Sequence, residues 1–583
     1  MKKLLVYLKD YKKETVLAPL FKMLEASFEL FVPLVMAQII DTGIADGDRG
    51  MIINMGLLLL ALGIIGLVCS ITAQFFAAKA AVGFSTGLKH ALFGHIQTLS
   101  FSEMDTVGTS TLITRMTSDV NQVQSGVNLV LRLFLRSPFI VFGAMVMAFT
   151  IDVKAAFVFV VTIPLLCLVV FGIMMISMPL YKKVQAGLDR ILGITRENLT
   201  GARVVRAFNK EESETARFRE GNEALTKMQM FVGKISALMN PVTYIIINGA
   251  VIVLIWIGAL QVDAGNITQG EVVALVNYMS QILVELIKLA NLIITVTKAL
   301  ACANRIEAVF ETKASLISPE KGRGKDFSKG KGADGVPAVL FEHVSLTYKN
   351  AGAESLTDID FRAERGQTIG IIGGTGSGKS SVVNMIPRFY DATKGRVLVN
   401  GVDVRDYTLE ELRGKIGVVM QKAVLFKGSI RENLLWGKED APEEELWRAL
   451  EISQAKEFVE AKEGGLEAKV AQAGKNLSGG QKQRLTIARA LVRRPEILIL
   501  DDSASALDFA TDAKLRKAIR EMEDAPTVFI VSQRAASIRY ADVILVMEDG
   551  EIAGMGTHDE LMESCSVYKE IYDSQFKKEG RVS

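Results

Sequence analysis

Six long apolar stretches in the first 300 residues constrain the fold of this chain more than any other feature. A helix needs about 20 apolar residues to cross the hydrocarbon core of a bilayer, and each stretch reaches that length. Helices buried in a large soluble core would show polar faces, which these stretches lack. We therefore expect an all-α transmembrane domain over residues 17–311. Its six spans are predicted near residues 17–40, 52–78, 129–151, 155–178, 238–260 and 272–298.

Lysine and arginine accumulate on one side of the predicted spans. Five lysines lie within residues 2–13 and six basic residues within 182–206, whereas the opposite turns at 41–51 and 261–271 are acidic with a single arginine. Because cytoplasmic loops carry the basic residues, both termini are expected in the cytoplasm. Residues 1–16 alternate leucines with lysines and lack a signal-peptide cleavage pattern, so we expect an amphipathic helix on the inner membrane surface.

Two inward connections, roughly residues 79–128 and 179–237, are each about fifty residues long and helical in character. At about 1.5 Å per residue, 20 extra residues extend a helix by roughly 30 Å. We expect the membrane helices to continue into the cytoplasm, with a short cross-helix closing each pair.

Several ionisable residues lie inside the predicted spans, where charge is costly. Glu25, Glu29 and Glu285 are candidates for a translocation path that would favour cationic amphiphiles. They are equally compatible with ion pairs between helices that only fix packing. For Arg132 and Arg136, pairing or snorkelling toward a membrane end is the favoured interpretation.

The second half of the chain has an ordinary soluble pattern. Residues 312–337 are rich in Gly, Lys and Ser and predict a flexible linker, and residues 577–583 a C-terminal tail. Between them, residues 338–576 alternate strand-like and helix-like segments, beginning with AVLFEHVSLTY, TIGIIG and RVLVNG. This alternation predicts an α/β domain with a largely parallel sheet.

A complete GxxxxGK[ST] phosphate-binding loop follows the strand TIGII, and we expect the next segment, SVVNMIPRFY, to be a helix. The glycines let backbone N–H groups point at phosphate oxygens. Lys379 is expected to reach the β- and γ-phosphates and Ser380 to ligate Mg²⁺. The predicted loop comprises Gly373, Gly374, Thr375, Gly376, Ser377, Gly378, Lys379, Ser380 and Ser381.

Two further segments fit nucleotide chemistry. The apolar strand at residues 497–500 ends in Asp501, placed as the second Mg²⁺ partner. The signature LSGGQ precedes a basic helix and offers another anion site, so a second nucleotide domain is expected to complete each site. That signature comprises Leu477, Ser478, Gly479, Gly480 and Gln481. The formal net charge of +2 gives no reason to expect a nucleic-acid partner.

LSGGQ together with the phosphate loop resembles the ATP-binding-cassette (ABC) proteins. Six spans ahead of one cassette resemble a half-transporter of the exporter type (type IV), and the likeness covers nearly the whole chain. It implies ATP and Mg²⁺ as cofactors, stacking of Tyr348 on adenine, and contact of Gln421 with Mg²⁺ and the attacking water. Tyr348 could instead be an ordinary strand aromatic. The resemblance further implies a loop that touches the opposite cassette, formed by Ser505, Ala506, Leu507 and Asp508.

Two catalytic positions depart from the family pattern. Asp502 stands where the family has a general-base Glu, and Gln533 where it has a switch His. The Asp carboxylate falls more than about 1 Å short of a water placed for Glu, and Gln cannot take up a proton as His can. Both catalytic residues are therefore expected to be impaired.

The Asp502 and Gln533 pair narrows the resemblance to heterodimeric bacterial multidrug exporters of the cell (inner) membrane. It implies a second half-transporter as partner, membrane lipid as surroundings and hydrophobic small molecules as substrates. ATP would be hydrolysed mainly at a site formed by the partner's Walker residues and this chain's LSGGQ. The alternative is a homodimeric exporter of lipid or peptide with its own slow ATPase. The six spans exclude a cassette protein without a transport role.

Overall fold

The structure is a computed structural model that describes residues 3–319, 335–349, 351–503 and 507–576. It divides into two compact units. The first contains the described parts of residues 1–97 and 109–312, and the second those of 98–108 and 313–583. The predicted linker and tail lie largely or wholly outside the described residues.

The described part of the first unit is helical throughout. Its α-helices are α1 (Lys12–Gln38), α2 (Arg49–Thr98), α4 (Thr109–Thr114), α5 (Val120–Leu133), α6 (Arg136–Ile151), α7 (Val153–Thr200), α8 (Ala202–Ala207), α9 (Glu211–Ala237), α10 (Met239–Asp263) and α11 (Gln269–Glu311). A 3₁₀-helix (Leu4–Tyr11) precedes α1, and single π-turns follow α1 (Ile39–Ile44) and α4 (Arg115–Asp119). The helix α1 thus includes the last five residues, 12–16, of the segment predicted to lie on the membrane surface.

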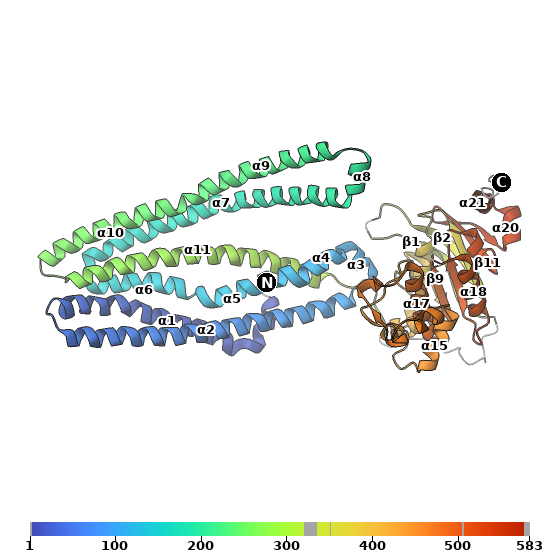
Figure 1. Ribbon diagram of the computed structural model, residues 1–583, viewed down its shortest axis with the longest axis horizontal. Coiled ribbons are helices and arrows are strands. Elements are labelled where there is room, and N and C mark those ends of the chain that lie inside the picture. The colour runs from blue at the N-terminus through green and yellow to red at the C-terminus, as the bar shows by residue number, and fades with distance from the viewer. Residues whose placement is uncertain (1–2, 320–334, 350, 504–506, 577–583) are drawn as a thin grey trace. The chain divides into compact units, whose positions relative to one another are not determined.

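Six helical stretches of the described chain are long and apolar enough to cross a membrane, and each contains one predicted span. The six-span expectation is therefore confirmed. Helix α11 lies at the centre of the bundle, where it packs against α1, α5, α6, α7 and α10. Helices α7 and α9 run side by side and are joined at one end by the short helix α8 (Figure 1). The expected short helix closing each inward connection is present as α8 and as α3 (Phe101–Val107).

The second unit contains α3 and an α/β domain. The strands are β1 (Val339–Leu346), β2 (Leu356–Ala363), β3 (Thr368–Gly373), β4 (Lys394–Val399), β5 (Val402–Asp403), β6 (Ile416–Val419), β7 (Gly428–Ser429), β8 (Lys469–Val470), β9 (Ile497–Asp501), β10 (Thr527–Val531), β11 (Val543–Glu548) and β12 (Glu551–Gly556). The helices are α12 (Lys379–Met385), α13 (Leu409–Gly414), α14 (Ile430–Leu435), α15 (Glu443–Ile452), α16 (Lys456–Glu460), α17 (Gly479–Val492), α18 (Phe509–Arg520), α19 (Ala535–Ile538), α20 (His558–Ser564) and α21 (Ser566–Phe576).

The prediction of one largely parallel sheet is only partly right. A six-stranded sheet in the order β12-β11-β3-β10-β9-β6 is parallel except for the β11–β12 pair. The segments AVLFEHVSLTY and RVLVNG, however, supply β1 and β4 of a separate antiparallel sheet, β2-β1-β4-β5. The alternating burial of their neighbour β2 suits a sheet with one buried face.

The helix expected over SVVNMIPRFY is also shorter than predicted. Helix α12 ends at Met385, two residues before Pro387. Proline lacks a backbone N–H and disfavours helical geometry in the residue before it, which accounts for the early end. The residues after Met385 form turns, so Phe389 and Tyr390 lie outside the helix.

Strand order positions the site. In the parallel part of the sheet, β10 lies between β3 and β9, and all three strands are buried along their whole length. Because parallel strands end at the same edge, the phosphate loop after β3, Asp501 at the end of β9 and the segment after β10 meet there.

Candidate nucleotide-binding site

A cavity of about 330 Å³ opens at this edge of the sheet. It is lined by Tyr348, Ser355, Thr375, Gly376, Gly378, Lys379, Ser380, Ser381, Gln421, Asp501, Asp502, Val531, Ser532 and Gln533. The structure thus brings most of the sequence-predicted nucleotide residues together around one cavity. Gly373, Gly374 and Ser377 belong to the same loop but do not line the cavity. Ser355, Val531 and Ser532 were not predicted, because no motif marks such small or apolar residues.

The phosphate loop depends on left-handed backbone at two glycines. Gly376 has φ +86° and Gly378 has φ +95°, a region that side chains with a Cβ rarely adopt. The Lys379 ammonium folds back over the loop and donates to the carbonyls of Gly373 at 3.0 Å and Gly374 at 2.5 Å. Burial lowers the pKa of Lys379, although the carboxylates of Asp501 and Asp502 oppose that shift.

Ser380 and Asp501 form the pair expected to hold Mg²⁺. The Ser380 hydroxyl donates to Asp501 Oδ1 at 3.0 Å. Asp501 is buried, and this burial raises its pKa; Ser380 and Lys379 pull the pKa down, and the neighbouring Asp502 carboxylate pushes it further up. A buried carboxylate with one hydroxyl donor retains acceptor capacity for a cation.

The two departures from the family pattern both line the cavity. Asp502 follows β9 with φ +44°, and its backbone N–H donates to Val531 O at 2.9 Å. Gln421 Nε2 donates to Asp502 Oδ2 at 3.3 Å, so these two side chains are adjacent. Gln533 is exposed and lies two residues beyond β10. Their roles in hydrolysis remain predictions.

Tyr348 lies beyond the end of β1, at the cavity wall, and is half-buried. Its hydroxyl is 2.9 Å from Ser381 Oγ, and its ring meets the ring of Tyr390 edge-on at 5.0 Å. Burial raises the pKa of Tyr348. Adenine stacking on this ring remains a prediction.

The signature residues lie outside the cavity lining. Leu477 is buried, whereas Ser478 and Gly479 are exposed at the start of α17. Ser478 and Gln481 form a capping box at this helix, with the Ser478 N–H donating to Gln481 Oε1 at 3.1 Å and the Gln481 N–H donating to Ser478 Oγ at 3.3 Å. The signature therefore presents a capped helix start to the surface of this domain.

The loop expected to touch an opposite cassette is only partly described. Ser505 and Ala506 lie outside the described residues, and Leu507 is buried. Asp508 caps α18 by accepting from the Thr511 N–H and hydroxyl, both at 2.8 Å. These hydrogen bonds lower the pKa of Asp508.

The donor set suits a magnesium–nucleotide complex rather than a free-standing metal site. Among the described residues, no cluster of three or more His, Cys, Asp or Glu side chains could hold a metal. Magnesium is commonly held by one or two protein oxygens together with substrate phosphates and water. Ser380, Asp501 and the amide oxygen of Gln421 fit that pattern, and Lys379 supplies the cation for the phosphates.

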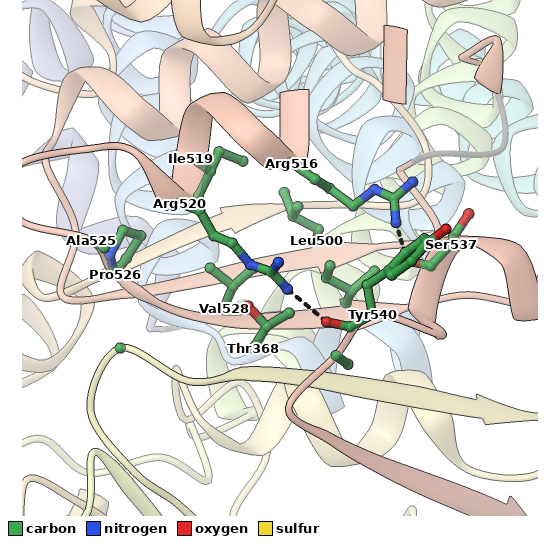
Figure 2. Close-up of a pocket in the computed structure, with 13 residues that line it drawn as sticks. Thr368, Leu500, Arg516, Ile519, Arg520, Ala525, Pro526, Val528, Ser537 and Tyr540 are labelled. Atoms are coloured by element: carbon green, nitrogen blue, oxygen red, sulfur yellow. Dashed lines mark hydrogen bonds between the residues drawn. The ribbon is translucent and has the colours of Figure 1, made fainter. Parts of the chain in front are cut away.

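A second, smaller cavity of about 30 Å³ lies in the same domain, and its polar side chains are used for packing (Figure 2). Two arginines of α18 line it, and their guanidinium groups bind backbone carbonyls. Arg516 Nη1 donates to Ser537 O at 2.9 Å, and Arg520 Nη2 donates to Tyr540 O at 2.6 Å. These bonds tie α18 to the segment around α19.

The three candidate acids of the membrane helices, Glu25, Glu29 and Glu285, are ion-paired. Glu25 accepts from Lys22 at 2.5 Å within α1. Glu29 of α1 and Glu285 of α11 bind the two ends of the Arg136 guanidinium of α6, each at 2.6 Å. The geometry agrees with the pairing interpretation for these acids and for Arg136. A role of Glu25, Glu29 or Glu285 in a substrate path remains a proposal.

Comparison with known proteins identifies relatives over the whole chain. Residues 15–286 match the family model described as the ABC transporter transmembrane region, and residues 356–505 match the one described as ABC transporter. An ABC transporter ATP-binding protein of Mycobacterium tuberculosis is 36% identical over 98% of this chain and 97% of the relative. A Bacillus subtilis protein is 31% identical over 99% of both chains, and its name describes it as a multidrug export ATP-binding/permease protein.

A solved structure has the same fold. The structure of a bacterial Atm1-family ABC exporter with ATP bound matches with a TM-score of 0.80 and covers 97% of this chain and 99% of that chain. The sequence identity is 22%, so this likeness bears on the fold alone.

Proposed function

We propose that this chain is the subunit with the impaired ATP site in a heterodimeric exporter. The chain belongs to the ABC transporter family, as an exporter-type half-transporter. The exporters of this family are driven by ATP, and the chain is a multi-pass membrane protein. In our proposal its Walker residues bind ATP and hydrolyse it very slowly. Its LSGGQ completes the partner's competent site, where hydrolysis drives the change between inward- and outward-facing states.

The observation that carries this proposal is the composition of the cavity. Lys379, Ser380 and Asp501 line the cavity together and have the chemistry that a phosphate and Mg²⁺ site needs, whereas Asp502 and Gln533 stand at the positions that we assign to the general base and the switch. Binding groups are thus intact while both proton-handling positions are altered. Loss of a general base typically costs about 10²–10⁴-fold in rate.

A second subunit is supported by the signature. Ser478 and Gly479 are exposed, and none of the five LSGGQ residues lines the cavity of this chain. An exposed, capped helix start offers N–H groups to an anion supplied from elsewhere. We propose that this anion is the nucleotide bound by the partner subunit.

We further propose amphiphilic drugs or lipids as substrates, moved from the cytoplasm or inner leaflet of a bacterial cell membrane, with both termini and the nucleotide-binding domain in the cytoplasm. The resemblance to a relative named for multidrug export supports the substrate class. ATPase stimulation by a panel of hydrophobic cations in liposomes, with the partner co-reconstituted, tests it; no response to any compound would contradict drug export.

The ATPase activity of the purified full-length chain tests the impaired site. We expect turnover at least about a hundredfold below the roughly 10 per second typical of enzymes. The double variant Asp502→Glu/Gln533→His should raise this rate, and Lys379→Ala should abolish ATP binding. A homodimer with brisk ATPase activity that Asp502→Asn abolishes would overturn the proposal and favour the homodimeric alternative.

A further inference from the structure

The turn that carries Gln533 is held at its rear by a residue from the far end of the chain. Gln575 on α21 donates from Nε2 to the carbonyl of Gln533 at 2.8 Å. Its Oε1 accepts from the N–H of Ala535 at 2.9 Å. One side-chain amide thus binds the backbone on both sides of Arg534.

The front of the same turn is fixed to the sheet. The Ser532 N–H donates to Ile371 O of β3 at 3.1 Å, and the Arg534 N–H donates to Ser532 Oγ at 2.9 Å. The backbone as far as Ser532 is therefore hydrogen-bonded to the parallel sheet. Beyond it, the backbone of Gln533 and Ala535 is tied to α21.

The bond to Ala535 fills a structural need. Ala535 is the first residue of α19 and is fully buried, and the N-cap residue Arg534 provides no side-chain cap hydrogen bond. The first N–H groups of a helix have no partner within the helix, and burying one unsatisfied is costly. Gln575 supplies that partner from a helix distant in sequence.

Helix α21 is itself firmly placed. Tyr568 is fully buried, and its hydroxyl lies 2.8 Å from His558 Nδ1 on α20. The side chains of Tyr572 and Phe576, which flank the amide in sequence, pack against the hydrophobic core of the domain. Gln575 therefore extends from a helix whose position is fixed by aromatic packing.

We propose that Gln575 is a positioning residue for the nucleotide site: by holding the Gln533 carbonyl and the start of α19, it keeps the Gln533 side-chain amide at the cavity, where it can donate to the terminal phosphate of ATP. This inference rests on the proposed function, since it requires that the cavity bind ATP. It assigns the helix α21 a role in nucleotide retention in addition to packing.

The experiment measures release of the fluorescent nucleotide mant-ATP, with Mg²⁺, from the full-length chain in lipid nanodiscs. Gln575→Leu removes both hydrogen bonds at similar volume, and we expect release about fivefold faster, the order of one lost hydrogen bond. Ser574→Ala, on the same turn and exposed, removes only a bond to the Ile571 carbonyl and should release nucleotide at the wild-type rate.

A double-mutant cycle separates positioning from general stabilisation. If Gln575 acts through Gln533, Gln575→Leu has no further effect in a Gln533→Ala background. An equal acceleration in both backgrounds, or wild-type release from Gln575→Leu, would overturn the inference. Should Gln575→Leu fold poorly, Gln575→Glu keeps the acceptor for Ala535 and loses the donor, and we expect an intermediate release rate. Failure of the wild-type chain to bind mant-ATP, or binding that survives Lys379→Ala, would instead contradict the proposed function.

Discussion

The substitution Arg136→Met tests whether the charges inside the membrane domain serve packing. The Arg136 guanidinium joins three helices of the bundle, since it binds Glu29 of α1 and Glu285 of α11 from its place at the start of α6. The Arg136 side chain is 7% exposed and that of Glu285 is 3% exposed, so this pair is removed from solvent. Glu285 also accepts from the Ser137 hydroxyl and the Lys288 ammonium, both at 2.7 Å.

The expected loss of stability follows from the burial of the Glu285 carboxylate. Removing one partner of a buried ion pair costs about 3–5 kcal/mol, because the other charge is left uncompensated. Glu285 keeps its contacts to Lys288 and Ser137, so we use the low end of this range. We expect Arg136→Met to lower the free energy of unfolding of the membrane domain by about 3 kcal/mol.

The assay is unfolding in mixed micelles with increasing SDS, followed by far-ultraviolet circular dichroism. Lys288→Met is the matched control, because it removes the other cation of Glu285 and leaves the Arg136 pair in place. We expect a smaller loss than for Arg136→Met, since Glu285 then keeps its buried partner. Adding Glu285→Gln to Arg136→Met should restore part of the loss, since the buried charge is then gone. Equal losses for Arg136→Met and Lys288→Met would refute the reasoning from burial.

Three further predictions concern the second unit. Because burial raises the pKa of Asp501, Mg²⁺-dependent ATP binding measured by calorimetry should weaken on acidification at a higher pH than for an ordinary aspartate. At neutral pH the ionised Asp501 does not stabilise the fold, because burial disfavours its charge. Asp501→Asn should therefore abolish Mg²⁺-dependent ATP binding at pH 7 without lowering the melting temperature. Tyr390→Phe removes the bond from the Tyr390 hydroxyl to Asp105 of α3 at 2.7 Å, and hydrogen exchange in residues 101–107 should rise about fivefold. Burial raises the pKa of Glu103, but hydrogen-bond donors on Ser100 and Ser315 outweigh burial, so the pKa is lowered overall. The ionised Glu103 therefore stabilises the folded state above about pH 4, and this stabilisation is lost as the pH falls. Glu103→Gln should accordingly speed hydrogen exchange in α3 at pH 7.

The parts of this fold that could be predicted are those in which local sequence meets a strong physical requirement. Lipid offers no hydrogen bonds to an open backbone, so an apolar run of spanning length is a helix whatever surrounds it. The phosphate loop is equally local, since the glycines and Lys379 stand within seven residues of one another.

Features that depend on distant pairing were not predictable from the sequence. Nothing in AVLFEHVSLTY indicates that it pairs antiparallel with RVLVNG in a second sheet, because either segment would also suit a parallel strand. In the same way, the sequence marked Arg136 as costly but could not name Glu29 and Glu285 as its partners, which lie on other helices. Gln575 carried no signal, since a lone amide near the end of a helix is usually solvated.

Two buried acids of the second unit differ in how far the surrounding protein balances their charge. Glu103 accepts four hydrogen bonds at Oε2, from the N–H and hydroxyl groups of Ser100 and Ser315, so its charge is balanced within the protein. Asp501 accepts from the single hydroxyl of Ser380, and burial leaves its pKa raised. A carboxylate that is buried without balance, at a cavity that also contains an ammonium group, is costly unless a ligand compensates it. On our proposal, Ser380, Asp501 and Lys379 would therefore bind the cation and the phosphates through charge and burial even though Asp502 and Gln533 stand at the two catalytic positions.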